Sequence, residues 1–203
     1  MSFKIIAITN RSLCAEPLPE RVSALCAAGV DQVIVREKDL STRAYEALLQ
    51  EILEAVEPDQ RKLISVNTFV GVAQQAGIVS VQLSLSALQE HPDFVHEFPS
   101  VGVSVHGKAE ALLAQRLGAS SLIAGHIFAT DCKPGVAPRG LDFLREICDA
   151  TAIPVYAIGG IDAHTIGSIK EAGADGACLM SELMTCLDVV EEIQRLRQAA
   201  LEA

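Results

Sequence analysis

The sequence is poor in features that would point to several classes of protein. It has no tryptophan, only 4 % aromatic residues, and 16 basic against 26 acidic side chains, which gives a net charge of −10. A phosphate backbone needs a basic surface, so this charge argues against nucleic acid as a partner. No apolar run approaches the roughly 20 residues of a membrane helix, so no membrane partner is expected either.

Cysteine pairs and metal-ligand spacings are also missing. The six cysteines include no CxxC pair, and the five histidines show neither HxH nor HxxxH spacing. Scattered cysteines in an apolar chain of this size are typical of reduced thiols, so a cytoplasmic protein is expected. The amino terminus leads directly into an apolar run at residues 5–9, which indicates a first strand and not a signal peptide.

Apolar residues are what the sequence has in abundance. Half of its 203 residues are hydrophobic, which is enough for one compact core, and we expect one domain over residues 1–203.

Eight apolar runs alternate with segments of helical periodicity. The expected strands are 4–9, 32–36, 62–67, 80–83, 101–106, 121–125, 153–160 and 176–180; the expected helices are 16–28, 41–55, 70–76, 88–94, 108–117, 141–150, 163–172 and 182–201. Repeated βα units at this count favour an α/β fold, a (β/α)₈ TIM barrel. A doubly wound open sheet is the alternative, although no GxGxxG follows the first strand.

In a barrel, the functional groups lie where the strands end. The residues expected there are Thr9-Asn10-Arg11, Arg36-Glu37-Lys38, Asn67, Gln82, Ser104, His106, the loop 125–135, Gly159-Gly160 and Ser181. Barrels commonly bind phosphate at the loops after the last two strands, because bare glycine amides and a helix amino terminus attract the anion there. Gly159, Gly160 and Ser181 are therefore candidate phosphate-binding residues, and Lys133 would add a positive charge.

Five motifs give the chain a family resemblance. They are Val35-Arg36-Glu37-Lys38, Gly102-Val103-Ser104-Val105-His106, Thr130-Asp131-Cys132-Lys133-Pro134-Gly135, Ala157-Ile158-Gly159-Gly160-Ile161 and Ala172-Gly173-Ala174-Asp175-Gly176. Together they resemble the thiamine-phosphate synthase/TenI superfamily over nearly the whole chain. The resemblance implies a barrel that works on the phosphorylated thiazole of thiamin biosynthesis, and a homo-oligomer.

Two departures from the synthase pattern concern its metal. The resemblance implies a synthase that joins a pyrimidine diphosphate to thiazole phosphate with Mg²⁺ held by two aspartates. This chain has Thr68 and Ala87 at those positions. Because a hard dication needs anionic oxygen ligands, no metal and no cofactor are expected.

The loop after the sixth strand departs in a different way. Its Gly125-His126 start and its Thr-Asp-Cys-Lys end at residues 130–133 are similar to the TenI branch of thiazole tautomerases. This branch implies an isomerase that aromatises the carboxythiazole phosphate tautomer without metal. His126 is then the expected acid/base residue, since an imidazole takes and returns protons near neutral pH.

The remaining candidate site residues are assigned to substrate binding. Thr130 and Lys133 would shape the pocket, and Cys132 would line it or act as a second acid/base group. Arg36, Lys38 and Asn67 would hold the substrate carboxylate or remain as rim residues, with Ser104 beside them. Two alternatives to the tautomerase stay open: a metal-dependent synthase, and a non-catalytic protein that binds thiazole or thiamin phosphates.

Overall fold

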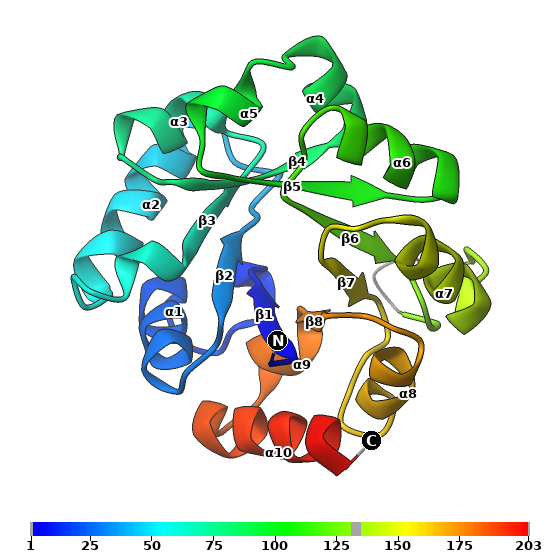
Figure 1. Ribbon diagram of the computed structural model, residues 1–203. Helices are drawn as coiled ribbons and strands as arrows, with labels where there is room; N and C mark the ends of the chain where they lie inside the picture. Colours follow the sequence, from blue (N-terminus) through cyan, green and yellow to red (C-terminus); the bar gives the residue numbers. More distant parts are fainter. Residues whose placement is uncertain (1, 131–134, 203) are drawn as a thin grey trace.

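Eight parallel strands form a closed barrel, and the helices surround it (Figure 1). The computed structural model describes residues 2–130 and 135–202. The strands are β1 (Lys4–Ile8), β2 (Gln32–Val35), β3 (Ile64–Asn67), β4 (Ser80–Ser84), β5 (Ser100–Val105), β6 (Ser121–Gly125), β7 (Val155–Ile158) and β8 (Gly176–Leu179). Ile6 of β1 pairs with Cys178 of β8, which closes the ring. The expected TIM barrel is therefore confirmed, and the open-sheet alternative is wrong.

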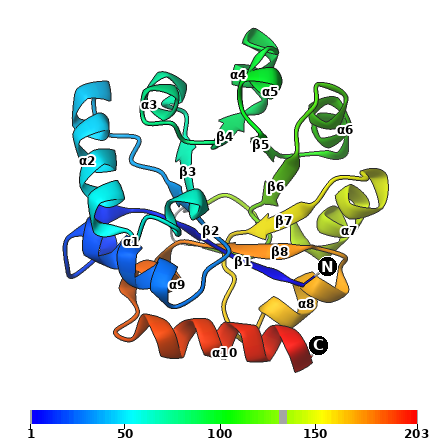
Figure 2. The same ribbon diagram turned by 60° about the vertical axis from the view of Figure 1, so that its left-hand side comes forward.

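The helices form an outer layer around the strands (Figure 2). They are α1 (Leu18–Ala27), α2 (Thr42–Ala55), α3 (Val70–Gln75), α4 (Leu85–Glu90), α5 (Phe94–Glu97), α6 (Lys108–Arg116), α7 (Gly140–Ala150), α8 (Ile166–Glu171), α9 (Ser181–Thr185) and α10 (Val189–Glu202), with short 3₁₀ turns η1 (Arg11–Leu13) and η2 (Arg61–Leu63). Among the described residues, no helix is long and apolar enough to cross a membrane.

The expected helix at 88–94 is two helices in the structure. α4 ends at Glu90, α5 begins at Phe94, and His91 between them has φ −134° and ψ 70°. Pro92 explains the break, because a proline disfavours the helical conformation in the residue before it.

The expected closing helix at 182–201 is also divided, into α9 and α10. The break depends on Arg21 of α1, which is only 4 % exposed. Its guanidinium donates to the carbonyl of Cys186 at 2.9 Å and pairs with the Glu16 carboxylate. Asp188 then begins α10 by accepting from the N–H groups of Val190 and Glu191 at 2.9 and 3.0 Å. The contact with Arg21 is long-range, so helical periodicity alone did not reveal it.

The inside of the barrel is divided into an apolar and a polar half. Ile6, Ile8, Ile34, Ile123 and Cys178 form one interior cluster. Side chains paired in register across parallel strands face the same side, so Ser65, opposite Ile34, also points inward. On the polar half, Gln32 donates to Ser80 at 2.9 Å, and Ser80 donates to Ser65 at 3.1 Å. The polar half thus runs from Gln32 of β2 through β3 and β4 to Ser104 of β5, which accepts from the Gln82 amide.

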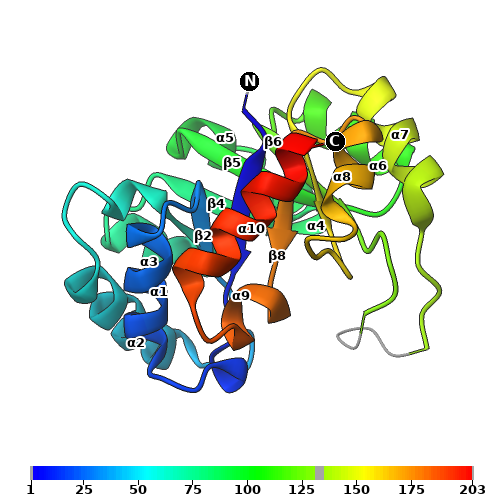
Figure 3. The same ribbon diagram turned by 90° about the horizontal axis from the view of Figure 1, so that it is seen from below.

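The carboxyl ends of the strands share one end of the barrel. In Figure 3, α9 lies at this end, and the amino terminus lies at the opposite end. β3 and β4 stand across the ring from β7 and β8 (Figure 1). Groups that follow these two pairs of strands therefore face each other across the mouth of the barrel.

Removing the Arg21 side chain tests its structural role. Arg21→Ala leaves the Glu16 carboxylate and the Cys186 carbonyl without their partner, so we expect the free energy of unfolding to fall by about 2–4 kcal/mol. Urea denaturation followed by circular dichroism measures this change. Arg43→Ala, on the exposed face of α2, is the control and should cost less than about 0.5 kcal/mol. Equal stability of the two variants would contradict the role of Arg21.

Candidate active site at the carboxyl end of the barrel

A buried carboxylate joins the ends of β1 and β2. Glu37 is 3 % exposed. It accepts hydrogen bonds from the Thr9 hydroxyl at 2.7 Å, from the Arg11 backbone N–H at 3.1 Å and from the Arg11 guanidinium at 3.0 Å. The Thr9 oxygen in turn accepts from the backbone N–H of Arg36 at 2.8 Å. This network fixes the backbone from which the Arg36 side chain leaves β2.

The same network leaves the Arg36 charge available. Arg11 also donates to both carboxylate oxygens of Asp39, at 2.7 and 2.5 Å, and this bond lowers the pKa of Asp39 to about 2. Both acids beside Arg36 thus have Arg11 as their partner. The guanidinium of Arg36 is partly buried and has no hydrogen bond or ion pair within the described part of the chain. It can therefore bind an external anion. Lys38 lies exposed two residues further on.

A row of amide and hydroxyl groups continues from Arg36 along β3, β4 and β5. Asn67 donates to the Gln82 carbonyl at 3.0 Å, and the Gln82 amide donates to the Ser104 hydroxyl at 3.1 Å. A Cβ atom on Gly102 would overlap the Gln82 side chain, so the glycine makes room for it. We call Arg36, Asn67, Gln82 and Ser104 the polar rim.

Across the mouth, two glycines follow β7. Gly159 and Gly160 have φ values of 102° and 65°, which favour glycine. A Cβ atom on Gly160 would overlap the Ala129 carbonyl, so the loop after β6 packs directly on the pair. Within residues 2–130 and 135–202, no group accepts a hydrogen bond from the two glycine amides. They are free to bind the oxygens of a phosphate.

The end of β8 adds further N–H groups. Ser181 begins α9 and is exposed, and no side chain caps this helix in the described chain. The neighbouring Glu182 pairs with Arg195 of α10 at 2.7 Å. The same guanidinium also pairs with Glu192 at 2.9 Å, so two carboxylates share it.

His126 lies behind the glycine pair. It is 4 % exposed, its Nε2 lies 3.3 Å from the Val136 carbonyl oxygen, and its buried Nδ1 has no partner among the described residues. A Cβ atom on Gly159 would overlap the Cβ of His126. The side chain therefore supports the loop from behind, and its expected role as an acid/base residue stays a prediction.

The structure brings most of the expected site residues to one barrel end. Arg36, Asn67 and Ser104 lie on one side, Gly159, Gly160 and Ser181 lie on the other, and Thr130 lies in the loop that follows β6. Cys132 and Lys133 lie outside the described residues. The sequence located Gln82 and Glu37 at strand ends but indicated no role for either. The alternation of polar residues along 80–84 could have indicated that Gln82 faces the barrel interior. The partners of Glu37 lie too far away in the chain to be inferred from the sequence.

Comparisons with known proteins show the family of the chain. A family model described as thiamine monophosphate synthase (TMP-TENI) matches residues 5–183. The chain belongs to this family. Thiamine-phosphate synthases of Syntrophomonas wolfei and Pyrococcus abyssi are each 31 % identical to it; the matches cover 97 % and 96 % of this chain and 95 % and 93 % of the relatives. The structure of a thiamine phosphate pyrophosphorylase from Pyrococcus furiosus matches with a TM-score of 0.82 and 30 % identity, covering 98 % of this chain and 96 % of that one.

These relatives correct the expected reaction class. They are named as synthases, which are transferases, whereas a thiazole tautomerase is an isomerase. The superfamily assignment is confirmed, and the isomerase assignment is wrong. It rested on the Gly-His start and the Thr-Asp-Cys-Lys end of the loop after β6, together with the missing aspartates at Thr68 and Ala87.

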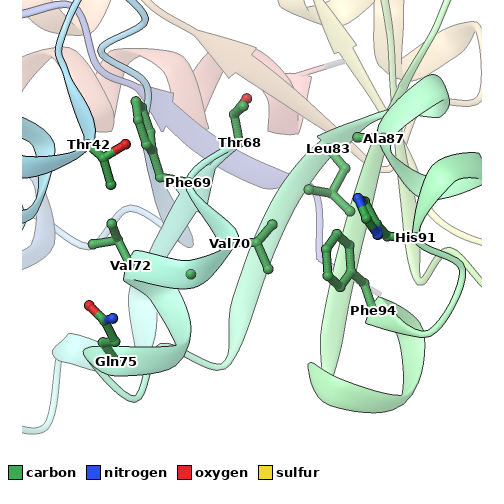
Figure 4. A pocket seen from close by; sticks show the side chains of 11 residues that line it. Thr42, Thr68, Phe69, Val70, Val72, Gln75, Leu83, Ala87, His91 and Phe94 are labelled. Carbon is green, nitrogen blue, oxygen red and sulfur yellow. The ribbon is translucent and has the colours of Figure 1, made fainter.

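The metal of the synthase does not fit the residues present. Thr68 and Ala87 line one groove of about 440 Å³ beside the ends of β3 and β4, shown in Figure 4. Its walls are largely apolar, with Phe69, Val70 and Leu83 among them, and no described residue lining it carries a carboxylate. No group of three or more His, Cys, Asp or Glu side chains in the described chain could hold a metal ion. Mg²⁺, which prefers carboxylate oxygens, therefore meets no carboxylate among the described residues that line this groove.

Thr68 offers a direct test of the backbone at this place. Its φ of 70° is unusual for a β-branched residue. Asn tolerates this conformation better, so Thr68→Asn should raise the free energy of unfolding by about 0.5–1 kcal/mol in urea denaturation. Thr68→Val retains the branched Cβ and should not be stabilised. If Thr68→Asn is no more stable than Thr68→Val, the backbone is not strained as described.

Proposed function

We propose that this family member is a thiamine-phosphate synthase-type transferase, which joins a pyrimidine diphosphate to a thiazole phosphate in thiamine biosynthesis. The names of its relatives support the reaction class. The observation that supports the proposal is that the polar rim and the glycine pair, two candidate anion-binding regions, lie on opposite sides of one barrel mouth. A reaction between two phosphorylated substrates needs such a pair of regions.

The polar rim is the proposed site of the diphosphate. In the transfer, the diphosphate leaves with the electrons of its carbon–oxygen bond, and a thiazole nitrogen forms the new bond to that carbon. Arg36 would stabilise the negative charge that develops on the leaving group, as charge-assisted hydrogen bonds do. Asn67 and Ser104 would orient the diphosphate, and Lys38 would approach it from the exposed loop.

The glycine pair is the proposed site of the thiazole phosphate. The amides of Gly159 and Gly160 would donate to phosphate oxygens, together with the first N–H groups of α9 at Ser181. Thr130 would border the thiazole from the loop after β6. The sequence predicts that Cys132 and Lys133 extend this border.

The coupling reaction itself is the first test. Purified protein incubated with the pyrimidine diphosphate and thiazole phosphate should form thiamine phosphate and release pyrophosphate, both measured by chromatography. A known thiamine-phosphate synthase serves as the positive control. No product under conditions in which the control turns over would remove the transferase proposal.

A non-catalytic role is the second candidate function. It is favoured by Thr68 and Ala87, which supply no carboxylate for the metal of the family. A protein of this kind would bind thiazole phosphate in calorimetry and form no product in the coupling assay.

The guanidinium of Arg36 gives a second test. Arg36→Gln removes a charge-assisted hydrogen bond, so the KM for the pyrimidine diphosphate should rise at least about tenfold. The KM for thiazole phosphate should change little, because that substrate binds across the mouth. Arg43→Gln is the matched control on an exposed helix face. An unchanged KM for the diphosphate in Arg36→Gln would contradict its placement on the polar rim.

A further inference from the structure

On the β3–β4 side of the mouth, the oxygen atoms that could coordinate a divalent cation belong to neutral groups. The Thr68 hydroxyl donates to the Asn67 side-chain oxygen at 3.2 Å. Ala87 occupies the first turn of α4, where its N–H donates to the Ser84 hydroxyl at 3.2 Å. The apolar side chain of Leu83 lines the same groove as Thr68 and Ala87 (Figure 4). Neutral hydroxyl and amide groups remain, and none of them offsets the charge of Mg²⁺.

The two described carboxylates that follow β2, Glu37 and Asp39, are already occupied. Glu37 accepts from Thr9 and Arg11, and Asp39 accepts from both terminal nitrogens of Arg11. A cation would have to displace this guanidinium to reach either acid. The partly buried Arg36 next to them would also repel it.

We propose that this chain binds a diphosphate at the polar rim without a divalent cation, and that Arg36 supplies the compensating charge instead. This rests on the proposed function only in the choice of a diphosphate as ligand. It departs from the metal dependence that the resemblance implies for synthases. In physical terms, having Thr68 and Ala87 in place of the two aspartates is sufficient to abolish cation binding.

Restoring the two carboxylates is structurally feasible. Asp tolerates the left-handed backbone at position 68 better than Thr does. An acidic residue at position 87 would lie in the first turn of α4, where the helix dipole favours negative charge. The variant Thr68→Asp/Ala87→Asp should therefore fold, and Thr68→Asn/Ala87→Asn is its uncharged control of the same size.

Calorimetric titration with inorganic pyrophosphate tests the proposal, once with EDTA and once with excess Mg²⁺. The wild-type protein should bind pyrophosphate in EDTA, and Mg²⁺ should not strengthen binding. The Asp/Asp variant should bind at least about tenfold more weakly in EDTA, because two carboxylates repel the anion, and should regain affinity with Mg²⁺. The Asn/Asn control should behave like the wild type. Paramagnetic resonance of added Mn²⁺ should show bound cation only in the Asp/Asp variant.

Two results would overturn the proposal. One is wild-type binding that is at least about tenfold tighter with Mg²⁺ than with EDTA; the other is no binding of pyrophosphate in either condition. The wild-type titration alone decides whether binding needs the cation, even if the Asp/Asp variant does not fold. If pyrophosphate binds without a cation and the coupling assay gives no product, this inference stands and the transferase proposal fails. If the assay gives product but pyrophosphate binding requires Mg²⁺, the transferase proposal stands and this inference fails.

Discussion

The buried carboxylate of Glu37 is the interaction on which the polar side of the site depends. A carboxylate that is 3 % exposed is costly unless its oxygens are hydrogen-bonded. Thr9 and Arg11 satisfy those oxygens, and the same Thr9 oxygen holds the Arg36 backbone. This one network connects the ends of β1 and β2. Because it pairs Glu37 and Asp39 with Arg11, the guanidinium of Arg36 remains available for a ligand.

The divided interior of the barrel explains why polar ligand-binding groups can stand on an apolar fold. The isoleucine-rich half supplies hydrophobic stabilisation, while the β3–β5 half is satisfied by its own hydrogen bonds, such as Gln82 to Ser104. This half ends in the polar rim. The opposite half ends in the glycine pair, where free amides replace side chains. The two substrates of the proposed transfer would meet between them.

The sequence was informative wherever local patterns decide the structure. Apolar runs located all eight strands, and the helix expected at 41–55 is α2, which Ser41 caps by accepting from the Ala44 N–H. It was uninformative where distant contacts decide. Arg21 of α1 bonds to the segment that divides the closing helix, and Glu37 accepts hydrogen bonds from residues after β1. Gly159 packs directly against His126. The mistaken isomerase assignment rested largely on that histidine and the short loop around it, whereas the relatives that match along nearly the whole chain are named as synthases.

The central claim is that two anions bind on opposite sides of the mouth without a metal bridge. A crystal structure of the protein with thiazole phosphate and inorganic pyrophosphate, grown with Mg²⁺ present, tests it most directly. The account predicts the phosphate on the amides of Gly159 and Gly160, and pyrophosphate on the Arg36 guanidinium with no cation beside Thr68. Pyrophosphate held through a metal ion, or both anions bound outside the mouth, would contradict it.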